Sequence, residues 1–180
     1  VDRKGVLNTN RKDLNKYNQD LAIDTQSNTF GECIVDADVF IGVSGANLLK
    51  ESHLLSMSAD PIIFALANPD PEILPSDAHQ IRDDIVMATG RSDFPNQVNN
   101  VLGFPFLFRG ALDAKATEIT DKMLIAASKA LASLTKEPVP QDVLEAYGLK
   151  SLTFGPEYII PKPFDSRLID WVAKAVQDAA

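Results

Sequence analysis

The sequence predicts an α/β fold in which a parallel sheet comes first and a group of helices follows. Three short apolar runs, at residues 37–43, 61–67 and 84–88, have the composition of buried strands. Helical segments separate these runs, and strands that alternate with helices form parallel βαβ units. After Thr89 the apolar residues recur only at helical spacing, so no further strand is expected.

Each element of the sheet half has its own signal. Residues Asn8–Asn28 are polar and predict a loop with at most a short helix at Leu14–Leu21. The first apolar run, Ala37–Val43, predicts a strand that is buried on both faces, and the turn Ser44–Asn47 follows it. The later elements are, in order, a helix at Leu48–Ser58, a strand at Pro61–Ala67, a short helix at Ser76–Arg82 and a strand at Asp84–Ala88.

Three main helices are expected in the second half of the chain. Residues Asn99–Leu112 are strongly apolar, and an amphipathic helix begins after Thr117 or Thr120. Asp165 is the expected N-cap of the last helix. The segment Pro138–Pro163 is predicted to be irregular because prolines interrupt it.

Composition and charge exclude several classes of function. The chain has 180 residues, with 17 Lys and Arg against 25 Asp and Glu, and a net charge of −8. An acidic chain without a basic face is not expected to bind nucleic acid or an anionic membrane. No apolar run approaches the roughly 20 residues that span a bilayer. The lone Cys33 cannot form an internal disulfide and indicates a reducing cytoplasm, and two histidines are too few to predict a His–Cys zinc site.

Small and polar residues follow the first two predicted strands, at the edge where open parallel sheets bind cofactors. Gly42 and Gly45 lie on either side of Ser44. Small residues let a ligand approach the backbone closely, although a tight turn explains one of the two glycines equally well. Asn68 precedes Pro69, which is a common turn signal. Its amide could instead hold a carboxylate or a carboxamide in the same crevice, because it both donates and accepts.

The stretch Thr89–Asn100 places many polar residues directly before an apolar helix. Free N–H groups and the dipole at a helix start favour an anion there. Ordinary capping accounts for one asparagine and leaves the second of the pair Asn99 and Asn100 unexplained. The carboxylates Asp83 and Asp84 are interpreted as solvated charge, because adjacent side chains point to different faces.

Three blocks, Asp38–Gly45, Ile63–Pro69 and Thr89–Leu102, resemble bacterial malic enzymes, and the resemblance covers nearly the whole chain. It implies a Rossmann-type, three-layer αβα domain with a parallel sheet, of which residues 1–180 form the C-terminal part. The fold is therefore expected to be incomplete, without the glycine fingerprint and the N-terminal catalytic domain. The segment Phe154–Asp165 resembles the large hybrid malic enzymes, in which a phosphotransacetylase-like domain follows and NADP is the usual cofactor.

The resemblance also implies an activity, which is the oxidative decarboxylation of (S)-malate to pyruvate and carbon dioxide with reduction of NADP or NAD. The family's Mg²⁺ or Mn²⁺ and its catalytic Tyr and Lys are expected in the part that precedes Val1. No catalytic or metal-binding residue is therefore assigned within these residues, and the isolated chain is expected to be inactive. The full-length enzyme is expected to be a homo-oligomer.

Seven residues match the family's ligand contacts. Asp2 matches the acid beside the ribose, although an N-terminal carboxylate can also be merely solvated. Arg3, directly after it, could bind a 2′-phosphate and therefore favours NADP. The expected cofactor contacts are Asp2, Arg3, Ser44, Gly45 and Asn68, and the expected malate contacts are Asn68, Asn99 and Asn100.

Two alternatives stay open at this point. A different nicotinamide-dependent dehydrogenase would need a histidine general base in the crevice, and the only histidines are His53 and His79. An interaction or regulatory Rossmann-like module would instead expose an apolar patch large enough to serve as an interface.

Overall fold

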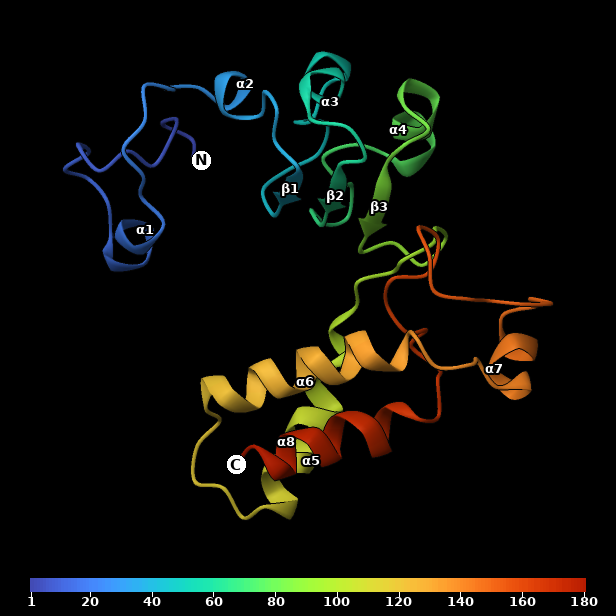
Figure 1. The fold of residues 1–180 in the computed structure, drawn as a ribbon. Coiled ribbons are helices and arrows are strands. Elements are labelled where there is room, and N and C mark those ends of the chain that lie inside the picture. Colours follow the sequence, from blue (N-terminus) through green and yellow to red (C-terminus); the bar gives the residue numbers. More distant parts are fainter.

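The computed structural model describes residues 1–180 and has a sheet half and a helical half (Figure 1). Strands β1 (Val39–Gly42), β2 (Ile62–Ala65) and β3 (Val86–Thr89) form a parallel sheet in the order β1-β2-β3. In register, their last residues Gly42, Ala65 and Thr89 lie side by side. The strands point their carboxyl ends toward the helical half (Figure 1). The predicted α/β fold with a parallel sheet is confirmed.

Helices α3 (Glu51–Ser56) and α4 (Pro75–Ile81) lie together on one side of the sheet (Figure 1). They follow β1 and β2, and α2 (Phe30–Cys33) precedes β1. Their apolar side chains share one core cluster with the inward-facing residues of the strands. Its fully buried members are Leu54, Ile63, Ala65 and Ala78. Of the predicted layers, the sheet and one layer of helices are therefore present in these residues.

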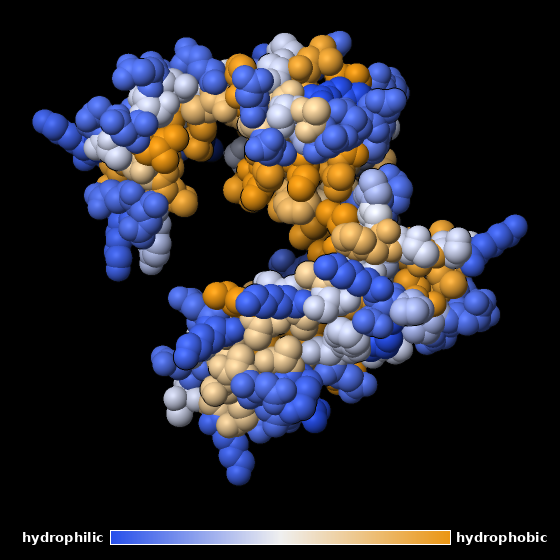
Figure 2. All heavy atoms as spheres, viewed as in Figure 1, coloured by the Kyte–Doolittle hydropathy of each residue, from blue (hydrophilic) through white to orange (hydrophobic).

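The prediction that the first strand is buried on both faces is wrong. Val39, Ile41 and Val43 are 49%, 62% and 76% exposed. Successive side chains of a strand point to opposite faces, and α3 and α4 cover only one of them. Figure 2 shows hydrophobic residues gathered along the side of the sheet half that borders a hollow.

Arg82 joins the segment before β3 to α3 and the residues that follow α3. The Arg82 guanidinium pairs with Asp84 at 2.5 Å and donates to the carbonyl oxygens of Leu54 and Ser58 at 2.9 and 2.8 Å. The backbone N–H of Asp60 also donates to Asp84, at 3.0 Å. The interpretation of Asp84 as solvated charge is therefore wrong. The exposed Asp83 makes no such contact.

The N-terminal segment contains the short helix α1 (Lys16–Asp20) within the predicted loop, so this prediction is confirmed. In Figure 1 the segment extends to one side of the sheet. No helix of the chain is both long and apolar enough to cross a membrane.

The helical half forms a second core. After the 3₁₀ turn η1 (Asn100–Leu102), the chain builds α5 (Phe104–Asp113) and α6 (Asp121–Leu134), and it ends with the π-helical segment η2 (Ile169–Ala173) and α8 (Lys174–Asp178). Thr120 is the N-cap of α6 and accepts a hydrogen bond from the N–H of Met123. The segment predicted to be irregular contains the short helix α7 (Gln141–Ala146), whose Val143 and Leu144 are buried. The central buried residues are Leu102, Met123, Leu134, Leu168, Val172 and Val176.

Candidate functional site

The carboxyl edge of the sheet borders the hollow between the two halves (Figures 1 and 2). Three connecting segments start at this edge, at residues 43–50, 66–74 and 90–99. Ligands of open parallel sheets bind outside the carboxyl ends of the strands. Five of the seven predicted contact residues lie in these segments or directly after them, at Ser44, Gly45, Asn68, Asn99 and Asn100.

Gly42 ends β1 and Gly45 follows it, and different surroundings explain the two glycines. A Cβ on Gly42 would lie 2.4 Å from Cδ of Glu72, so the protein itself requires a glycine at this position. A Cβ on Gly45 would meet nothing within 4 Å. Internal packing therefore leaves the surroundings of Gly45 free for a ligand, next to the exposed Ser44.

The segment after β2 presents a free amide. Asn68 is exposed, its side chain has no hydrogen-bond partner in the chain, and its peptide bond to Pro69 is cis. The neighbouring Asp70 lies close enough to Arg91, in the segment after β3, to act on its pKa. The pKa of Arg91 is raised mainly by the hydrogen bond to Asp93 and further by the charge of Asp70. The second and third segments therefore bring opposite charges near one another.

The two adjacent asparagines after β3 have separate surroundings. The side chain of Asn99 accepts a hydrogen bond of 3.0 Å from the N–H of Val101 and is the N-cap of η1. The exposed side chain of Asn100 has no partner. Capping thus occupies the first asparagine, and the second is free to bind a ligand.

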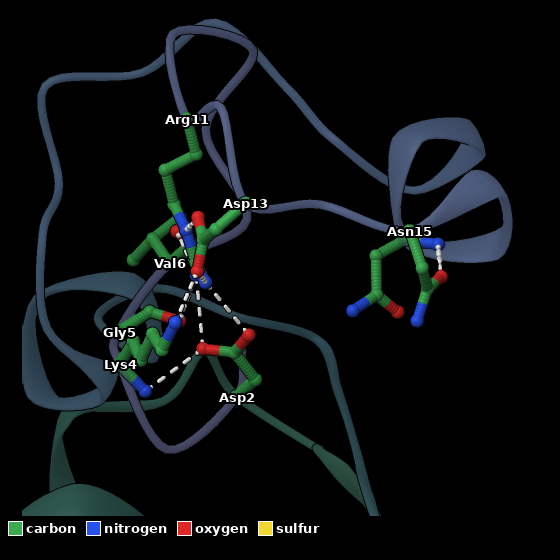
Figure 3. A network of polar contacts seen from close by, with 8 residues as sticks. Asp2, Lys4, Gly5, Val6, Arg11, Asp13 and Asn15 are labelled. Carbon is green, nitrogen blue, oxygen red and sulfur yellow. Dashed lines mark hydrogen bonds and ion pairs between the residues drawn. The ribbon is translucent and has the colours of Figure 1, made fainter.

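The N-terminal pair lies outside the three strand-end segments. Arg11 donates to both carboxylate oxygens of Asp2, at 2.9 and 2.8 Å, and the backbone N–H of Lys4 also donates to Asp2 (Figure 3). The hydrogen bond from Arg11 lowers the pKa of Asp2. Lys4 in turn pairs with Asp13 at 2.7 Å. Arg3 is exposed and makes no ion pair, so it is the cation beside Asp2 that remains free.

Two buried polar residues near the site were not singled out from the sequence. Glu72 has no exposed surface, and both its carboxylate oxygens accept backbone hydrogen bonds. A lone carboxylate before the apolar pair Ile73-Leu74 was the available signal. Asn96 is 3% exposed and donates to the carbonyl oxygens of Met87 and Pro156 at 2.9 and 2.6 Å. Asn96 thereby holds the segment around Pro156 against β3.

Neither histidine lies in the three segments that follow the strands. His53, in α3, accepts a hydrogen bond from the N–H of Lys50 and contacts the ring of Phe30 edge-on. His79 is exposed and lines a cleft of about 240 Å³ between α4 and the segment after β3. No three His, Cys, Asp or Glu side chains are grouped so that they could hold a metal ion.

Comparisons with known proteins identify relatives of this chain. Residues 1–146 match the family model described as "Malic enzyme, NAD binding domain". The chain is 55% identical to the NADP-dependent malic enzyme of Halomonas elongata, over 100% of this chain and 43% of that protein. It is 54% identical to the NADP-dependent malic enzyme of Rhizobium meliloti, over 99% of this chain and 24% of that protein.

A solved structure is also similar. The NAD-dependent malic enzyme of Thermotoga maritima superimposes with a TM-score of 0.82 at 40% identity, over 100% of this chain and 44% of that chain. The chain therefore spans less than half the length of each of these three relatives.

Proposed function

The chain belongs to the malic enzyme family, within its NAD-binding domain, and from this membership we propose the activity of the protein that contains it. That activity is the oxidative decarboxylation of (S)-malate to pyruvate and carbon dioxide, with reduction of NADP. The observation that carries the proposal is the pair of unpartnered amides, Asn68 after β2 and Asn100 after β3, together with the open position at Gly45 after β1. Residues 1–180 contribute ligand contacts to this reaction.

The free amides fit the chemistry of malate. The side chain of Asn100 would donate to a malate carboxylate, and a hydrogen bond to a charged group contributes about 1.5–3 kcal/mol. Asn68 lies after the neighbouring strand and can both donate to malate and accept from the nicotinamide carboxamide. Asn99 would support Asn100 by ordering η1, because its own side chain is engaged as a cap.

The dinucleotide fits the open backbone after β1. Ser44 and Gly45 would lie against the nicotinamide, which accepts a hydride from malate when it is bound. NADP rather than NAD is supported by the free Arg3 and by two relatives that are named NADP-dependent. Asp2 retains its proposed place near the ribose. Its carboxylate would act there together with Arg11, with which it already pairs.

The metal ion, the oligomeric state, the cellular location and the domain organisation concern the whole protein. The family's Mg²⁺ or Mn²⁺ has no fitting group of ligands in this chain, so no residue here is assigned to it. Assembly as a homo-oligomer stays a prediction, and so does a cytoplasmic location, which the free Cys33 supports. The hybrid organisation also stays a prediction, because the chain is equally similar to relatives of which it covers 43% and 24%.

A second candidate function is an interaction module. The exposed side chains of Val39, Ile41 and Val43 favour it, since a bare apolar sheet face is suited to cover by another surface. The other alternative, a dehydrogenase with a histidine base, gains no support because His53 and His79 lie in α3 and α4 and not in the segments that follow the strands.

Malate turnover by the full-length protein tests the proposal. We expect NADP reduction that requires malate and Mg²⁺ or Mn²⁺, with one pyruvate and one carbon dioxide for each NADPH. Formation of oxaloacetate without carbon dioxide would indicate a simple malate dehydrogenase. Failure to reduce either dinucleotide, in a protein that is folded, would favour the interaction module.

A further inference from the structure

The buried carboxylate of Glu72 links two loops of the candidate site. Its Oε1 accepts a hydrogen bond of 2.9 Å from the N–H of Ser44, which follows β1. Its Oε2 accepts one of 3.1 Å from the N–H of Ala67, which follows β2 and directly precedes Asn68. One side chain with no exposed surface therefore contacts the backbone beside two predicted ligand contacts.

The backbone around Glu72 strengthens this link. Its carbonyl oxygen accepts from the N–H of Leu49 at 3.1 Å, and the carbonyl oxygen of Pro71 accepts from the N–H of Asn47 at 3.2 Å. The N–H of Leu66 donates to the carbonyl oxygen of Gly42 at 2.9 Å. The loop after β1 is thus attached along most of its length to the segment that contains Glu72.

A carboxylate is the group that this position requires. Two backbone N–H groups meet two side-chain oxygens, and only an ionised acid offers an acceptor at both. A glutamine would place its NH₂ against one of these N–H groups and leave that donor unsatisfied. Burying a carboxylate is costly unless it is hydrogen-bonded, and these two hydrogen bonds offset that cost. Gly42 makes room for it, since a Cβ there would lie 2.6 Å from Oε1.

We propose that Glu72 is a positioning residue, which sets the location of Ser44 and Gly45 relative to Asn68 and so aligns the cofactor contacts with the malate contacts. This inference rests on the proposed function for its ligands. The physical reason is that the backbone of both loops is hydrogen-bonded to the same buried carboxylate. A shift of about 1 Å in positioning can lower a reaction rate by roughly 100-fold.

The test compares Glu72→Gln with wild type in the full-length protein. We expect the NADPH Kd to rise about 10-fold and kcat/KM for malate to fall roughly 10- to 100-fold, because both loops move. Hydrogen exchange should accelerate in peptides that cover the N–H groups of Ser44 and Ala67. Asp84→Asn is the matched control, because it weakens the ion pair with Arg82 before β3 and does not touch the carboxyl edge.

The outcomes separate the two proposals. If Glu72→Gln loses stability as Asp84→Asn does but keeps its NADPH Kd and malate kinetics within twofold of wild type, Glu72 is only structural and the inference is overturned. If wild type binds NADPH but does not turn over malate, the proposed reaction fails, and the NADPH Kd and the exchange of the two loops still decide the role of Glu72. Gly42→Ala combined with Glu72→Ala provides a second variant. Without the carboxylate, the new Cβ at position 42 no longer clashes with the side chain at position 72. We expect this double variant to have the same binding defect.

Discussion

Asn99 and Asn100 are neighbours in the chain, yet only the first has a hydrogen-bond partner for its side chain. The carboxamide oxygen of Asn99 accepts from the N–H of Val101, two residues later, at 3.0 Å. The carboxamide of Asn100 is exposed and free. The same residue type thus serves local structure at one position and remains available for a ligand at the next.

Asn100→Ala should therefore lower kcat/KM for malate in the full-length protein while leaving cofactor binding nearly intact. Loss of a hydrogen bond to a charged carboxylate costs about 1.5–3 kcal/mol, which is roughly 10- to 150-fold. Steady-state kinetics with malate and a separate NADPH Kd measure the two effects. The control is Asn99→Ser, which retains an N-cap and should be nearly neutral. A cofactor defect with an unchanged malate KM would assign Asn100 to the other ligand.

Arg3→Ala should weaken NADP more than NAD. Arg3 has no partner in the chain, whereas Lys4 and Arg11 are paired with Asp13. An Arg–phosphate pair that is partly exposed contributes about 1–2 kcal/mol, so the NADP/NAD ratio of kcat/KM should fall roughly 5- to 30-fold. The exposed Lys12 is the matched control, and Lys12→Ala should leave the ratio unchanged. Parallel changes for both dinucleotides would show that Arg3 does not read the 2′-phosphate.

Asn96→Gly should destabilise the chain by about 1–3 kcal/mol, because buried partners lose their hydrogen bonds. The side chain donates to the carbonyl oxygens of Met87 and Pro156 and accepts from the N–H of Ile159. Urea unfolding, followed by the fluorescence of Trp171, measures the change. Asn47→Gly is the control. Asn47 has a positive φ of 58°, similar to the φ of Asn96, but its side chain is exposed. Equal stability of the two variants would refute the role of Asn96.

The stability contributed by Asp84 should depend on pH. Arg82 holds the pKa of Asp84 well below its usual range, mainly through their hydrogen bond. A lowered folded-state pKa means that the contribution is present above the unfolded-state pKa, near 4, and is lost as the pH falls below it. Asp84→Asn should thus lower the urea midpoint at pH 7, and the difference from wild type should shrink toward pH 2. The exposed Asp83→Asn should change little at either pH. A difference that is independent of pH would contradict this account.

Local patterns were sufficient to predict most elements of the fold. The short apolar runs correspond to β1, β2 and β3, and Thr120 is the N-cap of α6. Such features depend on residues a few positions apart, so side-chain periodicity and capping chemistry reveal them. The helix α7 was missed because its six residues lie in a proline-rich segment and show too little periodicity.

Charged residues whose partners are distant in the chain could not be interpreted in this way. Glu72 binds the N–H of Ser44 across 28 positions, and Arg82 reaches the carbonyl oxygen of Leu54 across another 28. A carboxylate in a sequence is by default a solvated charge. Only the packing of strands and loops shows that Asp84 is paired and that Glu72 is buried.

In the candidate site, too, residue types predicted some features and only the tertiary structure showed the others. The residue types at Gly45, Asn68 and Asn100 predict ligand contacts, because small residues and amides after parallel strands suit a cofactor crevice, with turn and capping chemistry as the competing explanation. The tertiary structure decided that these three are free, that Gly42, Asn99 and Asp2 are engaged within the protein, and that one face of β1 is exposed. The physical reason is that a hydrogen bond or a close contact depends on distance in space, and sheet register and loop attachment set that distance between residues far apart in the chain.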